Sequence, residues 1–465
     1  MNHTDFKEIE KIFENSRDYF NSHKTFSISH RRDSLKSLLK SIENHKEDIY
    51  KALKKDLNKS SREAFLTEYL LVVDEIKYML RHISSFSKNK KKFPGLTQMP
   101  GYLEIRKIPY GKVLIISPWN YPFQLSMTPI IGAIAAGNTV VLKPSEFSPN
   151  VGDVLEIILK ESLEKGLASV VFGEAEEAEF LLTLPFDKIF FTGNPRVGKI
   201  VMKNAAKNLI PVTLELGGKS PAIIHSSANI KDSAKKIAFG KVMNSGQTCI
   251  APDYVLVPKD KKEIFINEIL KCFDEFFPTE KYFKEYFPKM NHSGRYNRMT
   301  ELLKDNKIKT NRNNIFYEDT LQIFPCVVDN PSWNSRIMEE EIFGPLLPVI
   351  PYESEDELFD IFKNKEKPLA LYLFGNDKVF FERAMTEIDS GGVTINDTLL
   401  HVSSSKAPFG GVGNSGMGNY HGKYSFDTFS HDRTVLKKFN LFDFNFRYHP
   451  FKKSFMYEFL KKLYK

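Results

Sequence analysis

The sequence predicts an α/β protein with two doubly wound parallel sheets, and three observations support this. The chain has 465 residues, which is too many for one compact core. Between residues 112 and 207, short apolar runs alternate with segments of helical periodicity. A second alternation of this kind runs from about residue 216 to 400. Alternating strands and helices are typical of parallel sheets covered by helices.

The first 90 residues are predicted to form several helices. Residues 1–20 have mixed charge, Ser29–Asn58 is charged and amphipathic, and residues 61–86 continue the helical spacing of apolar side chains. Lys88–Pro94 is basic and is predicted to be an exposed link.

Four apolar runs in the first alternation are predicted to be buried strands. Each is short, rich in Val, Ile, Leu or Phe, and bounded by polar residues. Ligands of such sheets bind beyond the carboxyl ends of the strands. The predicted strands are 112–117, 138–143, 168–173 and 188–193, and the predicted helices are 126–136, 151–164, 174–184 and 197–207.

The second alternation is predicted to form another sheet with its own helices. Helices are expected at 228–244 and 259–277, and strands near 253–257 and 392–396. From residue 401 the chain is rich in glycine, and then aromatic and basic.

Composition excludes several classes of protein. The net charge is +8, but residues 434–465 hold seven Lys and one Arg against one Asp and one Glu, a net charge of +6. The rest is nearly neutral, so a broad nucleic-acid-binding face is not expected. The three cysteines favour a reducing, cytoplasmic setting without a disulfide framework. No secretory signal, membrane-spanning segment or metal site is predicted.

Cys249 is the first candidate for chemistry. It follows the polar, glycine-containing segment Asn244–Thr248, whereas a cysteine kept for packing normally has apolar neighbours. A nucleophilic cysteine needs access, backbone N–H donors and a nearby base. From composition alone, a buried packing role has roughly even odds. Cys272 and Cys326 lie in apolar periodic segments and are predicted to be core residues.

Two polar residues at strand ends are candidate partners of this thiol. Glu215 is flanked by leucines at the end of an apolar run, where burial would raise its pKa toward that of a general base. Alternation along the strand favours a solvated Glu instead. Asn120 follows another strand and offers an amide to a developing oxyanion, although a turn is the more frequent role for such a residue.

Two further strand ends suggest nucleotide binding. Lys143 and Glu146 follow a buried run, and such groups can bind ribose hydroxyls; ordinary charge at a strand exit is the alternative. Gly193–Gly198 joins a strand to a helix whose N-terminus suits a phosphate. It matches neither the dinucleotide fingerprint nor a P-loop, so alone it is a weak signal.

Two segments in the second half are less specific. The acidic run Glu339–Glu341 precedes a Phe-Gly-Pro turn, and it reads either as a solvated face or as a turn that brings Glu341 and Phe343 to a ligand. Pro408–Gly418 has five glycines in eleven residues and is predicted to be a close-packed loop.

Together these segments resemble an aldehyde dehydrogenase over nearly the whole chain. Six of them occur in the family's order, which is highly specific, and the ending resembles the class 3 and fatty-aldehyde branch. The six are Pro118-Trp119-Asn120, Lys143-Pro144-Ser145-Glu146, Phe191–Gly198, Leu214–Lys219, Gly246–Cys249 and Glu341–Pro345.

The resemblance implies a role for each residue. Cys249 is the nucleophile, Glu215 the general base and Asn120 an oxyanion donor, with the backbone N–H of Cys249 as the second donor. Tyr121 and Met243, neighbours of these residues in sequence, are expected to line an apolar substrate entrance. The implied cofactor-binding residues are Trp119, Lys143, Ser145, Glu146, Gly193, Arg196, Gly198, Leu216, Glu341 and Phe343.

The resemblance also implies an NAD-dependent oxidation of a medium- to long-chain or aromatic aldehyde. Glu146 opposes a 2′-phosphate, whereas Arg196, where many members carry a small residue, makes NADP use a second expectation. A cofactor-independent cysteine hydrolase and a coenzyme A-acylating aldehyde dehydrogenase are the alternatives. A hydrolase has no need of the cofactor segments, and Glu215 favours water over coenzyme A.

The branch implies a homodimer and a division of the chain. A cofactor domain is expected at 1–86 and 110–215, a catalytic domain at 216–404, bridging segments at 87–109 and 405–450, and a separate tail at 451–465. In the tail, Phe455, Phe459, Leu460 and Leu463 share a helical face, surrounded by Lys452, Lys453, Lys461, Lys462 and Lys465. This pattern suits peripheral contact with an anionic membrane. Packing on the protein body or on a second subunit is the favoured alternative.

Overall fold

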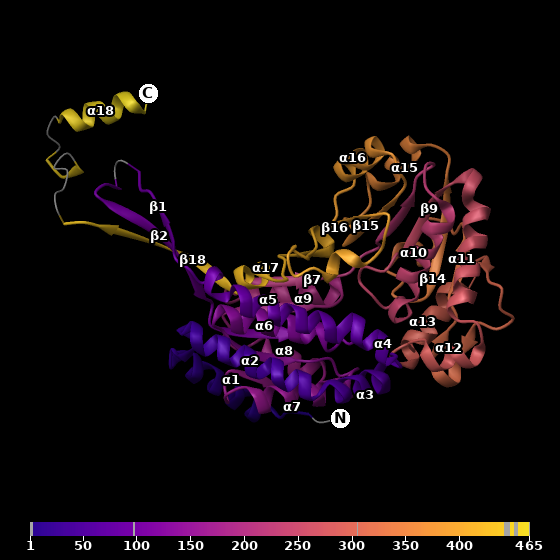
Figure 1. Cartoon of the computed structure of the whole chain (residues 1–465), viewed down its shortest axis with the longest axis horizontal. Helices are drawn as coiled ribbons and strands as arrows, with labels where there is room; N and C mark the ends of the chain where they lie inside the picture. Colours follow the sequence, from indigo (N-terminus) through magenta and orange to yellow (C-terminus); the bar gives the residue numbers. More distant parts are fainter. Residues whose placement is uncertain (1–2, 96–97, 305, 441–446, 451–453, 465) are drawn as a thin grey trace.

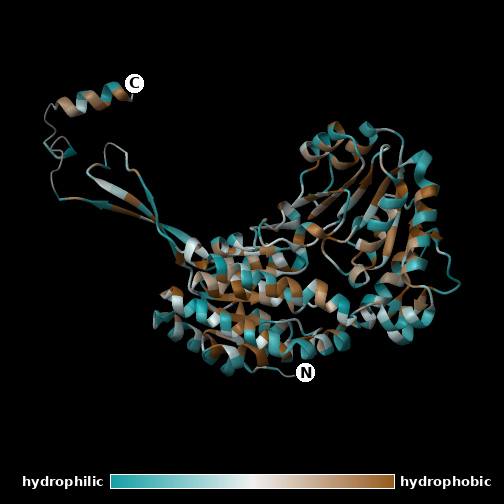
Figure 2. Cartoon of the chain, in the orientation of Figure 1, coloured by the Kyte–Doolittle hydropathy of each residue, from teal (hydrophilic) through white to brown (hydrophobic). Residues whose placement is uncertain are grey.

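The computed structural model describes residues 3–95, 98–304, 306–440, 447–450 and 454–464. Its strands form two large sheets, a three-stranded sheet and a small hairpin, β11 (Phe316–Tyr317) with β12 (Gln322–Ile323). Figure 1 shows two lobes side by side and an arm that projects from one of them. Apolar residues gather on the strands and on the inner faces of the helices (Figure 2).

The first large sheet has six strands, and all its pairings are parallel except the one between β17 and β7. All four predicted buried strands are confirmed here. Their Val-, Ile- and Phe-rich sequences are typical of strands that are covered on both faces. The order is β17 (Gly416–Met417), β7 (Val212–Glu215), β6 (Lys188–Thr192), β3 (Lys112–Ile116), β4 (Thr139–Lys143) and β5 (Ala168–Val170).

Helices cover both faces of this sheet. One face packs against α1 (Phe6–Asn21), α8 (Ala175–Leu181) and α9 (Pro195–Ala206). The other packs against α6 (Gln124–Ala136) and α7 (Pro149–Ser162), which are themselves covered by α2 (Ile28–Asn44), α3 (Lys46–Leu57) and α5 (Leu70–Phe86). Every residue of α6 is buried, so this helix lacks a polar face. The predicted stretch Ser29–Asn58 is two helices, because the chain turns at His45.

The second large sheet has seven strands and is parallel except for its edge strand β10. The order is β10 (Ile308–Lys309), β13 (Cys326–Asp329), β14 (Leu346–Tyr352), β9 (Tyr254–Pro258), β8 (Pro221–Ile224), β15 (Ala370–Phe374) and β16 (Gly392–Ile395). The helices of this region are α10 (Ile230–Val242), α11 (Lys262–Phe276), α12 (Glu280–Tyr286), α13 (Ser293–Leu303), α14 (Arg336–Glu339), α15 (Glu355–Phe362) and α16 (Lys378–Glu387).

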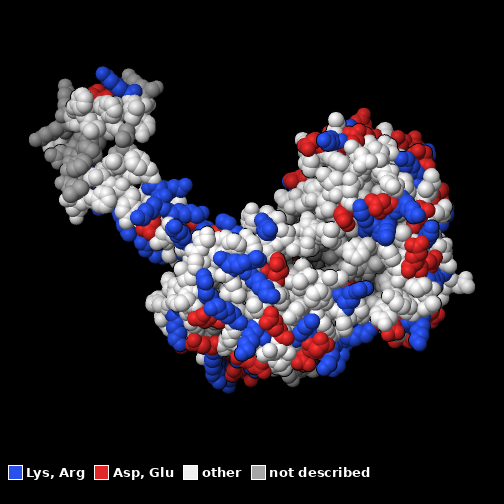
Figure 3. All heavy atoms as spheres, in the orientation of Figure 1, with Lys and Arg blue, Asp and Glu red and all other residues white. Residues whose placement is uncertain are grey.

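The arm is a three-stranded antiparallel sheet of β1 (Lys90–Lys92), β2 (Gly101–Pro109) and β18 (Ser430–Lys438). The predicted link Lys88–Pro94 is exposed at residues 88–93, as expected, but Pro94 is buried and part of the link is strand β1. Lys and Arg side chains gather on the arm (Figure 3). β18 follows α17 (Lys423–Thr428), which packs against α6.

The C-terminal helix α18 (Phe455–Leu463) lies beyond the end of the arm, away from both lobes (Figure 1). None of its side chains is buried, and Phe455 is 86% exposed. The expectation that the tail packs on the body of its own chain is therefore wrong. Lys452, Lys453 and Lys465 lie outside the described residues. Among the described residues, no helix has both the length and the apolar character needed to cross a membrane.

Candidate active site

Cys249 lies in a strained turn between α10 and β9. Asn244, Ser245 and Gly246 have φ values of 49°, 57° and 71°. Left-handed backbone is unfavourable for residues that carry a side chain. A Cβ atom on Gly246 would lie 2.3 Å from the Gly344 carbonyl oxygen, so this position requires glycine. The turn leaves Cys249 partly exposed, whereas the predicted core cysteines, Cys272 and Cys326, are buried.

Glu215 ends strand β7 and is only 3% exposed. Neither carboxylate oxygen has a hydrogen-bond partner among the described residues. Burial raises the pKa of this carboxyl well above its usual range. The solvated strand-face position that alternation favoured is therefore wrong. A buried acid with unpartnered oxygens and a raised pKa has the properties of a general base.

Asn120 contacts the turn that carries Cys249. The Asn120 side-chain nitrogen donates to the backbone carbonyl of Gln247 at 3.0 Å. The backbone carbonyl of Asn120 accepts a hydrogen bond from the Asn244 side chain at 2.8 Å. The next residue, Tyr121, hydrogen-bonds through its hydroxyl to Thr248 at 2.6 Å. An amide nitrogen carries two hydrogens, so Asn120 keeps one N–H for a further acceptor.

The electrostatic surroundings of Cys249 favour the neutral thiol. Burial raises its pKa above the usual range, and the nearby carboxylates of Glu341 and Glu215 raise it further. The backbone N–H groups of Cys249 and Ile250 act in the opposite direction. The sulfur thus lies close to two carboxylates and two N–H donors, and its proton needs an acceptor before the sulfur can attack an electrophile.

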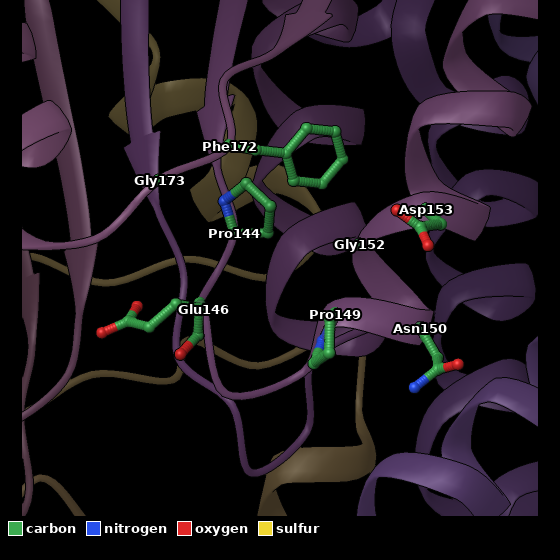
Figure 4. A pocket seen from close by; sticks show the side chains of 9 residues that line it. Pro144, Glu146, Pro149, Asn150, Gly152, Asp153, Phe172 and Gly173 are labelled. Atoms are coloured by element: carbon green, nitrogen blue, oxygen red, sulfur yellow. The ribbon is translucent and has the colours of Figure 1, made fainter. Parts of the chain in front are cut away.

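A cavity of about 320 Å³ lies beyond the carboxyl ends of β4 and β5 (Figure 4). The predicted Ser145 and Glu146 line it, and Glu146 accepts a hydrogen bond from buried Lys143 at 3.0 Å. The other residues of its wall, which sequence reasoning did not single out for this role, are Pro144, Pro149, Asn150, Gly152, Asp153, Phe172 and Gly173. Carboxylates that can accept hydrogen bonds from ribose hydroxyls lie here beside the apolar surface of a phenylalanine ring and two prolines. This combination suits a nucleoside.

The loop between β6 and α9 lies beside Glu215. Gly193 donates its N–H to the Glu215 carbonyl at 2.9 Å. A Cβ atom on Gly198 would lie 2.8 Å from a methyl carbon of Leu216, so this glycine lets α9 pack against the residue after Glu215. The predicted residues Gly193, Gly198 and Leu216 are thus brought together at one edge of the sheet.

The first turn of α9 explains why this loop departs from a glycine-rich fingerprint. Asn194 caps the helix by accepting the Val197 N–H at 3.0 Å, and Pro195 occupies the first helical position. Arg196 is exposed at this end of the helix. The exposed guanidinium adds a positive charge to the positive end of the helix dipole, and this helix end is therefore suited to an anion.

Glu341 reaches the site through a close approach to the chain after Glu215. A Cβ atom on Gly217 would lie 2.2 Å from a Glu341 carboxylate oxygen, and the Gly218 N–H hydrogen-bonds to this carboxylate. Burial, followed by the charge of Asp253, raises the pKa of Glu341 to about 8. The solvated-face interpretation of the acidic run is therefore wrong for Glu341.

Phe343 and Trp119 come from different lobes and meet at this site. Phe343 has a φ of 53°, and its ring packs edge-on against Trp119 at a centroid distance of 5.6 Å. The Arg295 guanidinium lies over the Trp119 ring at 4.2 Å. Both predicted aromatic residues thus lie together, and Arg295 adds a positive charge that sequence reasoning missed.

Sequence reasoning also missed Arg298, which holds the turn before Phe343. Its guanidinium donates to the Ile342 and Glu341 carbonyls, both at 2.6 Å, and to the Glu340 carboxylate at 3.0 Å. An arginine in a charged, amphipathic segment looks like an ordinary solvated residue, so no local signal identifies it.

Apolar and aromatic side chains surround the nucleophile. Met243, predicted at a substrate entrance, is partly buried and packs against the main core. Tyr372 and Tyr420 are fully buried; this burial, followed by smaller contributions that include the charge of Cys249, raises the pKa of both hydroxyls above their usual range. These two tyrosines lie close to Cys249 although they are more than 120 residues away in the chain, so local patterns could not identify them.

Comparison with known proteins identifies the family. The model of the aldehyde dehydrogenase family matches residues 1–435. The chain is 43% identical over 449 residues to the 4,4'-diaponeurosporen-aldehyde dehydrogenase of Staphylococcus aureus, covering 97% of this chain and 98% of that relative. It is 39% identical to a dimeric, NADP-preferring aldehyde dehydrogenase of Canis lupus familiaris, over 92% of this chain and 94% of that one.

A solved structure, the substrate-bound state of Staphylococcus aureus AldH, matches with a TM-score of 0.94 and 42% identity, covering 100% of both chains. The family model, these relatives and this structure agree with the predicted resemblance and its class 3 branch. The chain therefore belongs to the aldehyde dehydrogenase family.

Proposed function

We propose that this enzyme oxidises an apolar aldehyde to its carboxylic acid through Cys249, Glu215 and Asn120. NAD(P)-dependent aldehyde oxidation is the activity of its family. The observation that carries the residue assignment is the buried Glu215 carboxylate, which has unpartnered oxygens close to the Cys249 sulfur.

In the proposed reaction, the Cys249 thiol releases its proton to solvent water, and the thiolate attacks the aldehyde carbon, forming a C–S bond. The oxyanion accepts hydrogen bonds from the Asn120 side chain and a backbone N–H; one such donor is typically worth about 3 kcal/mol in the transition state. A bound nicotinamide would supply the acceptor for the hydride that this carbon loses when the thioester forms. Glu215 then takes a proton from water, and the water oxygen attacks the thioester carbon. The C–S bond breaks, and Glu215 returns the proton to the departing Cys249 sulfur.

The residues at the site fit a nicotinamide dinucleotide. We assign Lys143, Ser145 and Glu146 to the adenosine end, because they lie at the cavity beyond β4. We assign Glu341 and Phe343 to the nicotinamide end, because Glu341 lies near Cys249 and Phe343 packs against Trp119. Glu146 and Asp153 both line the cavity, and two carboxylates oppose a 2′-phosphate, so we place NAD before NADP.

An apolar substrate is supported by the tyrosines around Cys249. Tyr121, Tyr372 and Tyr420 are all buried, and the relative from Staphylococcus aureus is named for a diaponeurosporene aldehyde. We therefore expect kcat/KM to rise as an aliphatic aldehyde is lengthened. A steady fall with chain length, measured over a homologous series, would contradict this proposal.

The chemistry is tested by two substitutions in an NADH-release assay. Cys249→Ser should abolish aldehyde-dependent NADH formation, because the hydroxyl is a far weaker nucleophile. Glu215→Gln should keep a first burst of NADH and lose turnover, because the thioester then waits for an activated water. Wild-type turnover in Glu215→Gln would show that another group is the base. Restoration of turnover by coenzyme A would indicate an acylating enzyme.

We also propose a cytoplasmic homodimer, with the arm as the bridge and with the domain limits that the sequence predicts. Free cysteines support the compartment. The arm supports the dimer because it exposes large apolar side chains, such as Phe93 at 83% and Phe439 at 47%.

Removal of residues 450–465 should lower binding to anionic vesicles if α18 contacts membranes. Unchanged binding would leave the second subunit as its partner.

A further inference from the structure

A cluster of two buried charges and one half-buried charge lies behind the active site and is not used in the mechanism above. It consists of Lys59, Glu63 and Glu68, and is called here the α4 cluster because it surrounds α4 (Ser61–Ala64). The side chains of Lys59 and Glu68 are 0% exposed and form an ion pair at 2.6 Å. Lys59 also lies over the Tyr121 ring, 3.9 Å from its centroid.

The α4 cluster holds the segment that carries Asn120. The Lys59 ammonium donates to the Asn120 carbonyl at 3.0 Å. Glu68 accepts the backbone N–H groups of Phe123 and Gln124, each at 3.0 Å, where α6 begins. Three charge-assisted hydrogen bonds therefore fix the backbone on which the proposed oxyanion donor is mounted.

The same cluster holds the turn that carries Cys249. Glu63 accepts the Asn244 N–H at 2.8 Å, at the first of the left-handed residues. The Asn244 side chain donates to the Asn120 carbonyl at 2.8 Å, the same oxygen that Lys59 contacts. A non-glycine residue in left-handed backbone costs of the order of 1 kcal/mol and persists only when its surroundings hold it. Glu63 supplies such a contact.

The local helix geometry is irregular where it supplies these groups. Phe65–Tyr69 is a π-helical turn between α4 and α5, in which the Leu70 N–H bonds to the Phe65 carbonyl. Glu63 and Glu68 are five residues apart, which would place them roughly 140° apart around a regular α-helix. The wider turn brings them nearer to one face. Such turns are frequent at functional sites.

We propose that Lys59, Glu63 and Glu68 are positioning residues for aldehyde oxidation, which hold the Asn120 amide and the Cys249 sulfur at the spacing that the oxyanion requires. This rests on the proposed roles of Asn120 and Cys249. Stability alone gives little reason for such a cluster, because apolar replacements of buried ion pairs are often as stable. Burial raises the pKa of Glu63 to about 7 even beside Lys59, which is a further cost of placing it there.

The first test compares Glu63→Ala with Glu63→Gln. Alanine removes the acceptor of the Asn244 N–H, whereas the glutamine side-chain oxygen keeps it without the charge. We expect the rate of the first NADH burst to fall about tenfold in Glu63→Ala, as for a small misplacement of reacting groups, and to recover to within about threefold in Glu63→Gln. The KM for NAD should change less than about twofold in both, since the cofactor cavity is elsewhere.

Glu75 provides a matched control on α5. It is buried, whereas Glu63 is half-buried, but its pKa is likewise raised to about 7 by burial, and it accepts one backbone N–H, that of Gly422, at 2.7 Å. Glu75→Ala and Glu75→Gln should both keep the burst rate within about twofold of wild type. If Glu75→Ala slows the burst as much as Glu63→Ala does, the effect is general loss of structure and the proposal is wrong.

The second test removes the ion pair without leaving a buried charge. In Lys59→Met/Glu68→Gln, the glutamine oxygen still accepts the two N–H groups of α6, but the Asn120 carbonyl loses its ammonium donor. We expect a melting temperature near that of wild type and a burst about tenfold slower. A burst at the wild-type rate in this folded variant would overturn the role of Lys59. Should Glu63→Ala fail to fold, the double variant and Glu63→Gln decide the question.

Failure of the proposed function would be recognised separately. It would appear as wild-type protein without aldehyde-dependent NADH release, before any variant is compared.

Discussion

The two large sheets contribute to the site from opposite ends. The six-stranded sheet presents its carboxyl ends: Asn120 follows β3, Lys143 ends β4, and Glu215 ends β7. The seven-stranded sheet presents its amino ends, because Cys249 precedes β9 and Glu341 precedes β14. One sheet thus follows the usual rule for ligands of parallel sheets and the other reverses it. A shared architecture does not determine which edge carries the chemistry.

The largest effect is expected when Asn120 is replaced, because it is the hydrogen-bond donor at the carboxyl ends of the six-stranded sheet. Asn120→Ala should lower kcat by about 10²- to 10³-fold, because one oxyanion donor is lost from a buried site. Steady-state and burst rates should fall together, since both chemical steps pass through an oxyanion. A loss confined to the KM for aldehyde would instead assign Asn120 to substrate binding.

The pH dependence isolates the base at the end of β7. Hydrolysis needs the unprotonated Glu215 carboxylate, and burial raises its pKa, so activity is lost as the pH falls through that raised value. Below it, kcat should fall about tenfold per pH unit and the burst amplitude should persist. Profiles of wild type and Glu215→Gln check this, because the variant should lack the acidic limb. Identical profiles would exclude Glu215 as the titrating base.

The contribution of Glu341, at the amino ends of the seven-stranded sheet, is tested by adding one methyl group next to it. Gly217→Ala places a Cβ atom against the Glu341 carboxylate and should raise the KM for NAD about tenfold by displacing it. Gly218→Ala is the matched control, because its Cβ atom would lie 3.7 Å from the backbone of Pro368 and Leu369, an ordinary contact. Equal effects of both substitutions would mean that the displacement of Glu341 is not the cause.

The smallest expected effect concerns the choice of cofactor. Glu146→Gln removes one of two cavity carboxylates and should raise the ratio of kcat/KM for NADP over NAD by several-fold, because a partly exposed charge acts weakly. Glu161→Gln, on the same helix as Asp153 but paired with His45, should leave the ratio unchanged. An unchanged ratio in Glu146→Gln would assign the discrimination to another group.

Local sequence predicts the parts of the fold that local forces determine. The buried strands were predicted because runs such as 112–117 and 188–193 are apolar throughout, and Glu215 was found because leucines flank it. It could not be predicted that the second sheet contributes its amino ends to the site. A functional residue in the loop before a strand has the same local sequence pattern as an ordinary loop residue that follows a helix. Lys59 and Arg298 were missed for another reason. Lys59 lies in the link between two helices and Arg298 lies in an amphipathic helix, and a charge at either place has the same local pattern whether it is solvated or buried.

The exposure of the cysteines has a practical consequence. All three lie in the described part of the chain, and two are sealed in the core while Cys249 is reachable from solvent. The folded protein therefore offers one addressable sulfur. A single equivalent of a thiol-directed label should count working sites in a preparation, and protection by a bound aldehyde would report occupancy without any need for turnover.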